Sequence, residues 1–239
     1  MAEWTYGRLY AIADVEVLAR KGVGLREFAE ALRGAGVRVV QLRDKVGEPQ
    51  DVLAGAAVLR EVFEEDRGES RLRPDEVGPK MGHRVLLVMN DRVDLALIAG
   101  FGGVHVGQED MGVEDVRRVV REGFVVGVST HDEEQARVAE VSAADYVAIG
   151  PVFATGTKAD AAEVVGLEGV RRARALTTKP LVAIGGITRE NCRSVVEAGA
   201  DAVAVISGMF GEGETVEEVA REWVRLLSEA GLRGGRVQS

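Results

Sequence analysis

The chain has 239 residues, of which 46% are hydrophobic, and its formal net charge is −9. This length fits one closed α/β barrel, whose usual size is about 250 residues. The acidic balance argues against wholesale binding of nucleic acid or of an acidic membrane, and the single cysteine, Cys192, excludes an internal disulfide and a thiolate metal cluster.

Nothing in the sequence indicates a membrane segment or an export signal. No run of about 18 apolar residues occurs, and the first ten residues lack the basic-then-apolar pattern of a signal peptide. We therefore expect a soluble, cytoplasmic protein. Cys192 falls inside a predicted helix, where we expect a small buried hydrophobic side chain rather than a nucleophile.

Short apolar runs alternate with helical patterns along the chain. The runs predict eight strands, at residues 9–14, 37–43, 84–90, 103–106, 124–130, 145–150, 180–186 and 201–207. Apolar residues at helical spacing follow them, most clearly at residues 25–36, 50–63, 93–100, 113–121, 132–141 and 215–230. Eight strand-helix units predict a single-domain α/β fold, a (β/α)8 TIM barrel over residues 1–230. A doubly wound open sheet is the alternative, but no GxGxxG turn follows the first strand.

Two stretches show no apolar period. Residues 64–83 are highly charged and hold two prolines and three glycines, which predicts a long mobile loop. Because this insert joins a helix to the next strand, we expect it on the rim opposite the strand ends, without a catalytic role. Residues 231–239 are expected to form a disordered tail.

Two aspartates lie among the polar residues that follow two neighbouring strands. Asp91 comes after the strand that ends at Asn90, and Asp110 follows the next strand. A helical crossover makes these strands parallel, so both carboxylates emerge on one rim. Two carboxylates beside an amide form an oxygen-rich site suited to Mg²⁺, which shares its ligand shell with substrate phosphates. The alternative is that each aspartate caps the following helix; their pairing on adjacent strands favours the metal.

Other strand ends carry groups suited to anions. The Gly185-Gly186 pair and Ser207 follow the last two strands, where backbone N–H groups capture a monophosphate in barrels of this type. Arg43, Lys45 and Lys158 could neutralise a second, more highly charged anion beside the metal. The alternatives are glycines that only turn the chain and basic residues that are only solvated surface.

This inventory indicates two phosphorylated ligands, one of them a diphosphate leaving group, and no activated nucleophile. Ser129 and His131 are too close in sequence to form a triad, whose members meet from distant positions. His105 alternates with two valines and so points into the barrel. We expect it to be a hydrogen-bonded interior histidine rather than a general base.

Several motifs together resemble one known family. From residue 9 to about residue 210 they are YAIAD, QLRDK, NDRVDLA, GVHVGQED, GVSTH, DYVAIGPVFATGTK, PLVAIGGI and GADAVAVISGMF. In this order and spacing they are similar to thiamine-phosphate synthase. The resemblance implies an enzyme that joins 4-amino-5-hydroxymethyl-2-methylpyrimidine diphosphate to 4-methyl-5-(2-hydroxyethyl)thiazole phosphate. The implied products are thiamine phosphate and pyrophosphate, and the implied cofactor is Mg²⁺.

The resemblance also implies roles for individual residues, with Asp91 and Asp110 as the metal ligands. The residues implied to bind the pyrimidine diphosphate are Gln41, Leu42, Arg43, Asp44, Lys45, Asn90, Ser129 and Lys158, of which Arg43, Lys45, Ser129 and Lys158 are expected to act in catalysis. Those implied to hold the thiazole phosphate are Thr155, Gly156, Thr157, Gly186, Ile206 and Ser207. The implied mechanism is dissociative: pyrophosphate departs, and the thiazole nitrogen captures a pyrimidine methylene cation.

Two other classes compete with this interpretation. The related thiazole tautomerases share the barrel and a histidine near the end of strand five, where His131 lies, but they look depleted in the QLRxK and ND motifs that this chain keeps. A non-catalytic phosphate-binding barrel would need neither carboxylates nor leaving-group cations. We expect two phosphorylated small molecules as partners, with no nucleic acid and no membrane, and the sequence leaves a homo-oligomer open.

Overall fold

The predicted apolar runs form eight parallel strands that pair in chain order and close into a barrel. The computed structural model describes residues 4–64, 85–155 and 163–234. Its strands are β1 (Leu9–Asp14), β2 (Val39–Arg43), β3 (Leu86–Asn90), β4 (Gly103–Val106), β5 (Val125–Thr130), β6 (Tyr146–Ile149), β7 (Leu181–Ile184) and β8 (Ala202–Val205). Pairing of β1 with β8 closes the ring. The predicted (β/α)8 TIM barrel is confirmed.

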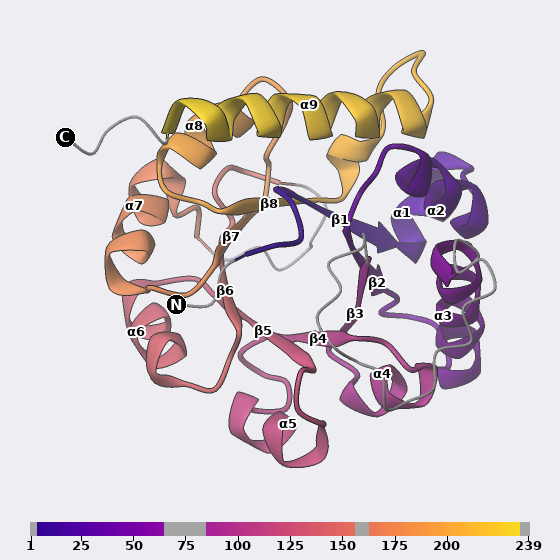
Figure 1. Cartoon of the computed structure of the whole chain (residues 1–239), viewed down its shortest axis with the longest axis horizontal. Helices are drawn as coiled ribbons and strands as arrows, with labels where there is room; N and C mark the ends of the chain where they lie inside the picture. The colour runs from indigo at the N-terminus through magenta and orange to yellow at the C-terminus, as the bar shows by residue number, and fades with distance from the viewer. Residues whose placement is uncertain (1–3, 65–84, 156–162, 235–239) are drawn as a thin grey trace.

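Helices surround the ring of strands (Figure 1). They are α1 (Val15–Lys21), α2 (Leu25–Gly34), α3 (Pro49–Glu64), α4 (Val93–Ala99), α5 (Val113–Val119), α6 (Glu133–Val141), α7 (Gly166–Leu176), α8 (Cys192–Glu197) and α9 (Val216–Gly234), with a short 3-10 turn, η1 (Ser207–Met209), after β8. Cys192 is buried as expected. Among the described residues, no helix is both long and apolar enough to cross a membrane.

Alternation along the strands produces two separate cores. In β1, Ala11 and Ala13 pack toward the helices, while Tyr10 and Ile12 point into the barrel. Successive side chains of a strand face opposite sides, so most strands contribute to both cores, whereas the apolar side chains of β4, Val104 and Val106, both lie in the helix-facing core. The helix-facing core is apolar, whereas the barrel interior mixes aliphatic residues with the two tyrosines Tyr10 and Tyr146.

Gly127 explains how a large aromatic side chain fits inside so narrow a barrel. It lies beside Tyr146 in the register of β5 and β6. A Cβ atom at position 127 would lie 2.0 Å from the Tyr146 ring, far inside van der Waals contact. The absence of a side chain on β5 therefore makes the room that the tyrosine on β6 occupies.

Three elements differ from the sequence-based expectation. Helix α1 was not predicted: Asp14 caps it by accepting a hydrogen bond from the Val17 N–H at 3.0 Å, and Gly22 ends it in the left-handed conformation. The turn η1 was not predicted either. Helix α9 continues to Gly234, so the tail expected at residues 231–239 is wrong for its first four residues. The predicted insert at residues 64–83 lies outside the described residues except for Glu64, which ends α3.

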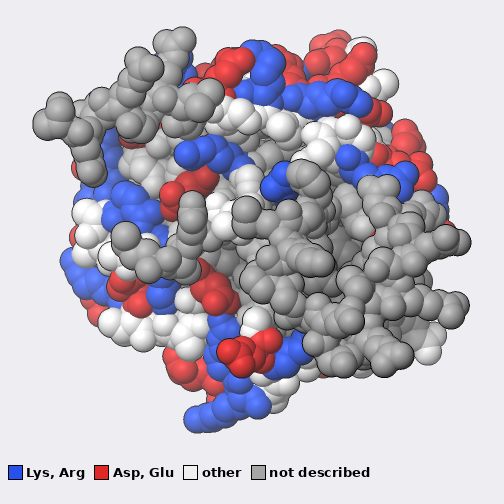
Figure 2. All heavy atoms as spheres, in the orientation of Figure 1, with Lys and Arg blue, Asp and Glu red and all other residues white. Residues whose placement is uncertain are grey.

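Charges of both signs are interspersed over the outer helices. Figure 2 shows basic and acidic side chains mixed around the rim of the molecule. On α9 the mixing follows helical spacing, since Arg221 pairs with Glu217 and Arg225 pairs with Glu229, four residues away in each case. Exposed pairs of this kind contribute a few tenths of a kcal/mol each.

Candidate active site

Two adjoining cavities open at the carboxyl ends of the strands. The acidic cavity has a volume of about 140 Å³ and is lined by Asp91, Asp110 and the basic residues Arg43 and Lys45. The glycine-walled cavity has a volume of about 380 Å³ and is lined by residues that follow β5 to β8, among them Gly185 and Gly186. The two cavities share Ser129, His131, Ala148, Ile184, Ala204 and Ile206. They are therefore two parts of one site.

Asp91 lies at the centre of the acidic cavity in an unusual backbone conformation. Its φ angle is +58°, in the left-handed region that few residues other than glycine adopt and that aspartate tolerates best. Its N–H donates to the His105 carbonyl at 2.8 Å, which ties the end of β3 to β4. Its carboxylate accepts a hydrogen bond from the Asn90 amide at 2.7 Å and forms an ion pair with Lys45.

Asp110 faces Asp91 across this cavity, as the crossover argument predicts. One Asp110 oxygen accepts a hydrogen bond from the Gly107 N–H at 2.7 Å. Partial burial raises the pKa of the Asp110 carboxyl, and the hydrogen-bonding contact with Asp91 raises it further. A carboxyl group whose ionisation is opposed by a neighbouring carboxylate marks a place where a cation is electrostatically favoured.

The donor set fits Mg²⁺ in kind. Among the described residues no group of three or more His, Cys, Asp or Glu side chains could hold a metal, so Asp91 and Asp110 supply a pair of ligands and no more. Mg²⁺ is characteristically bound by one or two carboxylates, with the remaining positions filled by waters and substrate phosphates. A site of this composition would be completed by a phosphorylated ligand.

Both predicted phosphate-binding cations of β2 and its loop are paired with carboxylates. Arg43 forms an ion pair with Asp14, a carboxylate whose residue is only 2% exposed. The Arg43 Nε atom is buried and has no hydrogen-bond partner among the described residues. Lys45 is about half exposed and pairs with Asp91. The lining of the acidic cavity thus holds two carboxylates and two cations, and the buried Asp14, which is not part of that lining, pairs with Arg43.

The side chains from Gln41 to Lys45 do not all face the acidic cavity. Gln41 points into the barrel and lines the acidic cavity together with Arg43 and Lys45. The Leu42 side chain, 1% exposed, packs in the core between sheet and helices. Asp44 accepts hydrogen bonds from the Val46 and Gly47 N–H groups and so shapes the turn after β2. The structure therefore brings Gln41, Arg43 and Lys45 together and directs the side chains of Leu42 and Asp44 elsewhere.

The glycine-walled cavity is formed largely by backbone. Gly185 and Gly186 have φ angles of +98° and +63°, and a Cβ atom at position 186 would lie 2.6 Å from the Ala154 carbonyl. Only glycine allows this close approach of the β6 and β7 loops. The cavity also contains Thr155, Ile206 and Ser207, as predicted, whereas Gly156, Thr157 and Lys158 lie outside the described residues.

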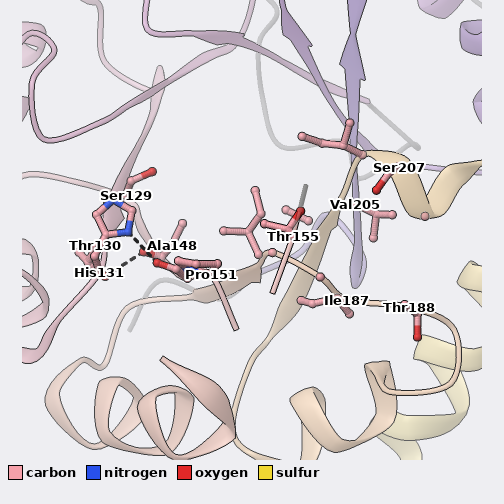
Figure 3. A pocket seen from close by; sticks show the side chains of 17 residues that line it. Ser129, Thr130, His131, Ala148, Pro151, Thr155, Ile187, Thr188, Val205 and Ser207 are labelled. Carbon is pink, nitrogen blue, oxygen red and sulfur yellow. Dashed lines mark hydrogen bonds between the residues drawn. The ribbon is translucent and has the colours of Figure 1, made fainter. Parts of the chain in front are cut away.

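Close-packed neighbours fix the walls of the glycine-walled cavity. In Figure 3, Ser129 and His131 lie on one side and Ser207 on the other, with Thr155 between them. The indole N–H of Trp223 on α9 donates to the Gly208 carbonyl at 2.9 Å and anchors the loop after β8. Trp223 is fully buried, so α9 packs against the loop that forms this wall of the cavity.

Ser129 and His131 hydrogen-bond to different partners and not to each other in the structure. His131 Nδ1 lies 2.6 Å from the Gly150 carbonyl, an acceptor, so Nδ1 carries a proton. Ser129 Oγ lies 2.8 Å from Nε2 of His105. His105 is accordingly a hydrogen-bonded interior histidine, as expected from its strand position.

A chain of hydrogen bonds continues from His105 through the barrel interior. His105 Nδ1 lies 2.9 Å from the Tyr146 hydroxyl, which lies 3.0 Å from the Tyr10 hydroxyl. The Gln41 amide donates to Tyr10 at 2.8 Å. Neither tyrosine was predicted to be part of the site. Residues i and i+2 of a strand share a face. The two tyrosines lie two residues before Ile12 and Ala148, which line the cavity, and this spacing was the available signal that they also face it.

Comparison with known proteins decides the family. Residues 79–209, more than half of the chain, match the family described as thiamine monophosphate synthase. The chain belongs to the thiamine-phosphate synthase family. It is 47% identical over 205 residues to the thiamine-phosphate synthase of Koribacter versatilis, a match that covers 85% of this chain and 89% of the relative. It is 39% identical over 226 residues to that of Methanocella arvoryzae, covering 95% and 97% of the two chains.

The solved structures agree with this assignment. A thiamine phosphate pyrophosphorylase from Pyrococcus furiosus superposes with a TM-score of 0.76 at 32% identity, covering 93% of this chain and 96% of the other. As a member of the thiamine-phosphate synthase family, this chain is a transferase of thiamine biosynthesis. The predicted family, enzyme class and pathway are confirmed.

Proposed function

We propose that the enzyme couples 4-amino-5-hydroxymethyl-2-methylpyrimidine diphosphate with 4-methyl-5-(2-hydroxyethyl)thiazole phosphate, giving thiamine phosphate and pyrophosphate with Mg²⁺ as cofactor. The observation that carries the proposal is the junction of two unlike cavities at Ser129. One cavity is rich in charged side chains, and the other is walled by glycine backbone. This division matches one ligand with a diphosphate leaving group and one with a monophosphate.

In the acidic cavity, Asp91 and Asp110 would hold the metal, and Mg²⁺ when bound would neutralise negative charge on the diphosphate. Arg43 and Lys45 would bind the phosphate oxygens after exchanging their carboxylate partners for the ligand. Asn90 already orients Asp91 through a hydrogen bond of 2.7 Å. By family resemblance, Lys158 would add a further positive charge.

In the glycine-walled cavity, the thiazole phosphate would be bound by Thr155, Gly186, Ile206 and Ser207, and by Gly156 and Thr157 through family resemblance. Free N–H groups next to positive-φ glycines form concave anion-binding surfaces. Gly185 and Gly186 provide two such positions in succession. The ring of this ligand would then extend toward Ser129, where the two cavities meet.

The chemistry we propose is dissociative. Arg43, Lys45 and Lys158 would stabilise the negative charge that develops on the departing pyrophosphate, leaving a pyrimidine methylene cation. The thiazole nitrogen, held by the neighbouring cavity, would capture this cation. In this route no side chain forms a covalent bond to the substrate, and Ser129 and His131 keep their hydrogen bonds to His105 and to the Gly150 carbonyl.

A coupling assay tests the proposal. The purified protein is incubated with both substrates and Mg²⁺, and thiamine phosphate is followed by chromatography, with EDTA as the control. We expect product that depends on the metal and on both substrates. Absence of product from a folded protein would contradict the proposal, and the tautomerase substrate would then be assayed with His131 as the candidate base.

A further inference from the structure

The hydrogen-bonded chain Gln41–Tyr10–Tyr146–His105–Ser129 has a direction, and we propose that it fixes Ser129 as a hydrogen-bond donor to the bound ligand. In this arrangement His105 is neutral and carries its proton on Nε2. Tyr10 and Tyr146 are then positioning residues that act on the ligand through His105 and Ser129. The identity of the ligand rests on the proposed function, whereas the order of the protons rests on the geometry.

The direction is set at the Gln41 end of the chain. The Gln41 amide nitrogen donates to the Tyr10 oxygen at 2.8 Å, which leaves the single Tyr10 proton to find an acceptor. Within the described part of the chain that acceptor is the Tyr146 hydroxyl at 3.0 Å. Tyr10 is 2% exposed, and a buried hydrogen-bond donor without a partner is destabilising. Tyr10 therefore donates to Tyr146.

The same reasoning carries the direction to His105. Tyr146 accepts from Tyr10 and has one proton of its own, which it donates to His105 Nδ1 at 2.9 Å. Burial raises the pKa of both phenols, so each keeps its proton. A doubly protonated His105 would place an N–H against Tyr146 and leave the Tyr146 proton without an acceptor. The neutral imidazole with its proton on Nε2 gives a donor and an acceptor to each of the described hydrogen bonds from Gln41 to Ser129.

The last step reaches the substrate site. The His105 Nε2–H donates to Ser129 Oγ at 2.8 Å, so the Ser129 proton remains for another acceptor. Ser129 lines both cavities. Its hydroxyl is thus presented to a ligand as a donor, which suits a phosphate oxygen or a ring nitrogen rather than an amino group.

The tautomer is tested directly by NMR of protein containing ¹⁵N-labelled histidine, without substrates or metal. The chain has three histidines, and the His105 signals are assigned by their loss in a His105→Gln variant. We expect the Nε2–H tautomer in the wild type and a mixture of tautomers in Tyr146→Phe, which keeps the ring that fills the space beside Gly127. A wild-type His105 that is protonated on Nδ1 would overturn the proposal.

A double-mutant cycle tests the positioning role. Tyr146→Phe should lower kcat about tenfold, the fold-change that corresponds to one hydrogen bond of about 1.4 kcal/mol. In a Ser129→Ala background the same substitution should change kcat less than about twofold, because its effect passes through Ser129. Equal losses in the two backgrounds would indicate a merely structural role and would overturn the proposal.

Two further variants keep the test decisive. Tyr10→Phe breaks the chain one residue earlier and should also mix the His105 tautomers, so it replaces Tyr146→Phe if that variant does not fold. Tyr6→Phe is the matched control, because Tyr6 is not part of the series of hydrogen bonds from Gln41 to Ser129. Tyr6 packs against Trp4 with ring centroids 5.5 Å apart. We expect the wild-type His105 tautomer and wild-type turnover in this variant. A wild type without coupling activity would refute the proposed reaction, while the NMR result would still decide the proton order.

Discussion

The two cavities at the rim are formed by different kinds of group: charged side chains in one and glycine backbone in the other. The acidic cavity consists of charged side chains held in ion pairs, such as Lys45 with Asp91. The glycine-walled cavity consists of backbone that comes close because side chains are absent at Gly185 and Gly186. Charged groups can exchange partners when a ligand enters, whereas a glycine wall has a fixed shape. We infer that ligand binding depends mainly on charge in the acidic cavity and mainly on shape in the glycine-walled cavity.

The largest effect is expected from the acidic cavity. Asp91→Asn keeps a residue that tolerates the left-handed φ of +58° but removes the negative charge. We expect turnover in the coupling assay to fall at least about a hundredfold, because charge stabilisation of the leaving group is lost. Asp115→Asn, on the exposed surface of α5 where Asp115 pairs with Arg118, is the matched control. Near-normal activity of Asp91→Asn at limiting Mg²⁺ would remove the metal assignment.

A smaller effect is expected in the glycine-walled cavity. Gly186→Ala places a Cβ atom 2.6 Å from the Ala154 carbonyl at a positive φ. We expect a loss of about 1–3 kcal/mol in the free energy of unfolding and a rise of about tenfold in KM for the thiazole phosphate, which corresponds to about 1.4 kcal/mol of binding. The KM for the pyrimidine diphosphate should change little.

The variant Gly123→Ala distinguishes the effect of a steric clash from the effect of backbone strain. Gly123 also has a positive φ, +78°, but a Cβ atom added there would meet no atom within 4 Å beyond its neighbours along the chain. Steady-state kinetics of this variant should match the wild type, and its stability should fall only through strain. If Gly186→Ala behaves like Gly123→Ala in both substrate constants, the glycine-walled cavity does not depend on the close approach at position 186.

The smallest effect concerns stability and pH. The pKa of Asp110 is raised in the folded state, first by partial burial and then by Asp91. Stability from its protonated form is present below the unfolded pKa and is lost as the pH rises through the folded pKa. Asp110→Asn removes this loss of stability, so in EDTA at neutral pH the variant should have a higher melting temperature than the wild type. The increase should be slight, because Asp110 is exposed to solvent.

This pH dependence is checked by the difference in melting temperature between Asp110→Asn and the wild type. The difference should grow from acid to neutral pH and should be absent for Asp115→Asn. A variant that is less stable than the wild type at neutral pH, without metal, would show that Asp110 contributes more through its hydrogen bond to the Gly107 N–H than it costs through its charge.

The sequence predicted the barrel because its signals are local and repeated. Each strand is a short buried apolar run; Asp91 follows β3 directly, and Asp110 lies shortly after the end of β4 at Val106. Helix α1 was missed because it begins immediately after β1, whose last residue, Asp14, also caps the helix. Helix α9 outlasts its apolar stripe, so its end at Gly234 left no pattern to follow.

Side-chain direction limited what family motifs could predict about the site. A contiguous motif such as residues 41–45 implies one function, but a strand sends alternate side chains to opposite faces, and Leu42 therefore packs against the helices. Tyr10 and Tyr146 look like ordinary strand aromatics in sequence. Their hydroxyl contact joins residues 136 positions apart, which no local pattern reports.

The division of labour between the two cavities is tested most directly by calorimetric titration of the protein with inorganic pyrophosphate, with and without Mg²⁺. We predict binding that requires Mg²⁺, is lost in Asp91→Asn and is retained in Gly186→Ala. Binding that needs no metal, or that survives in Asp91→Asn and disappears in Gly186→Ala, would contradict the account.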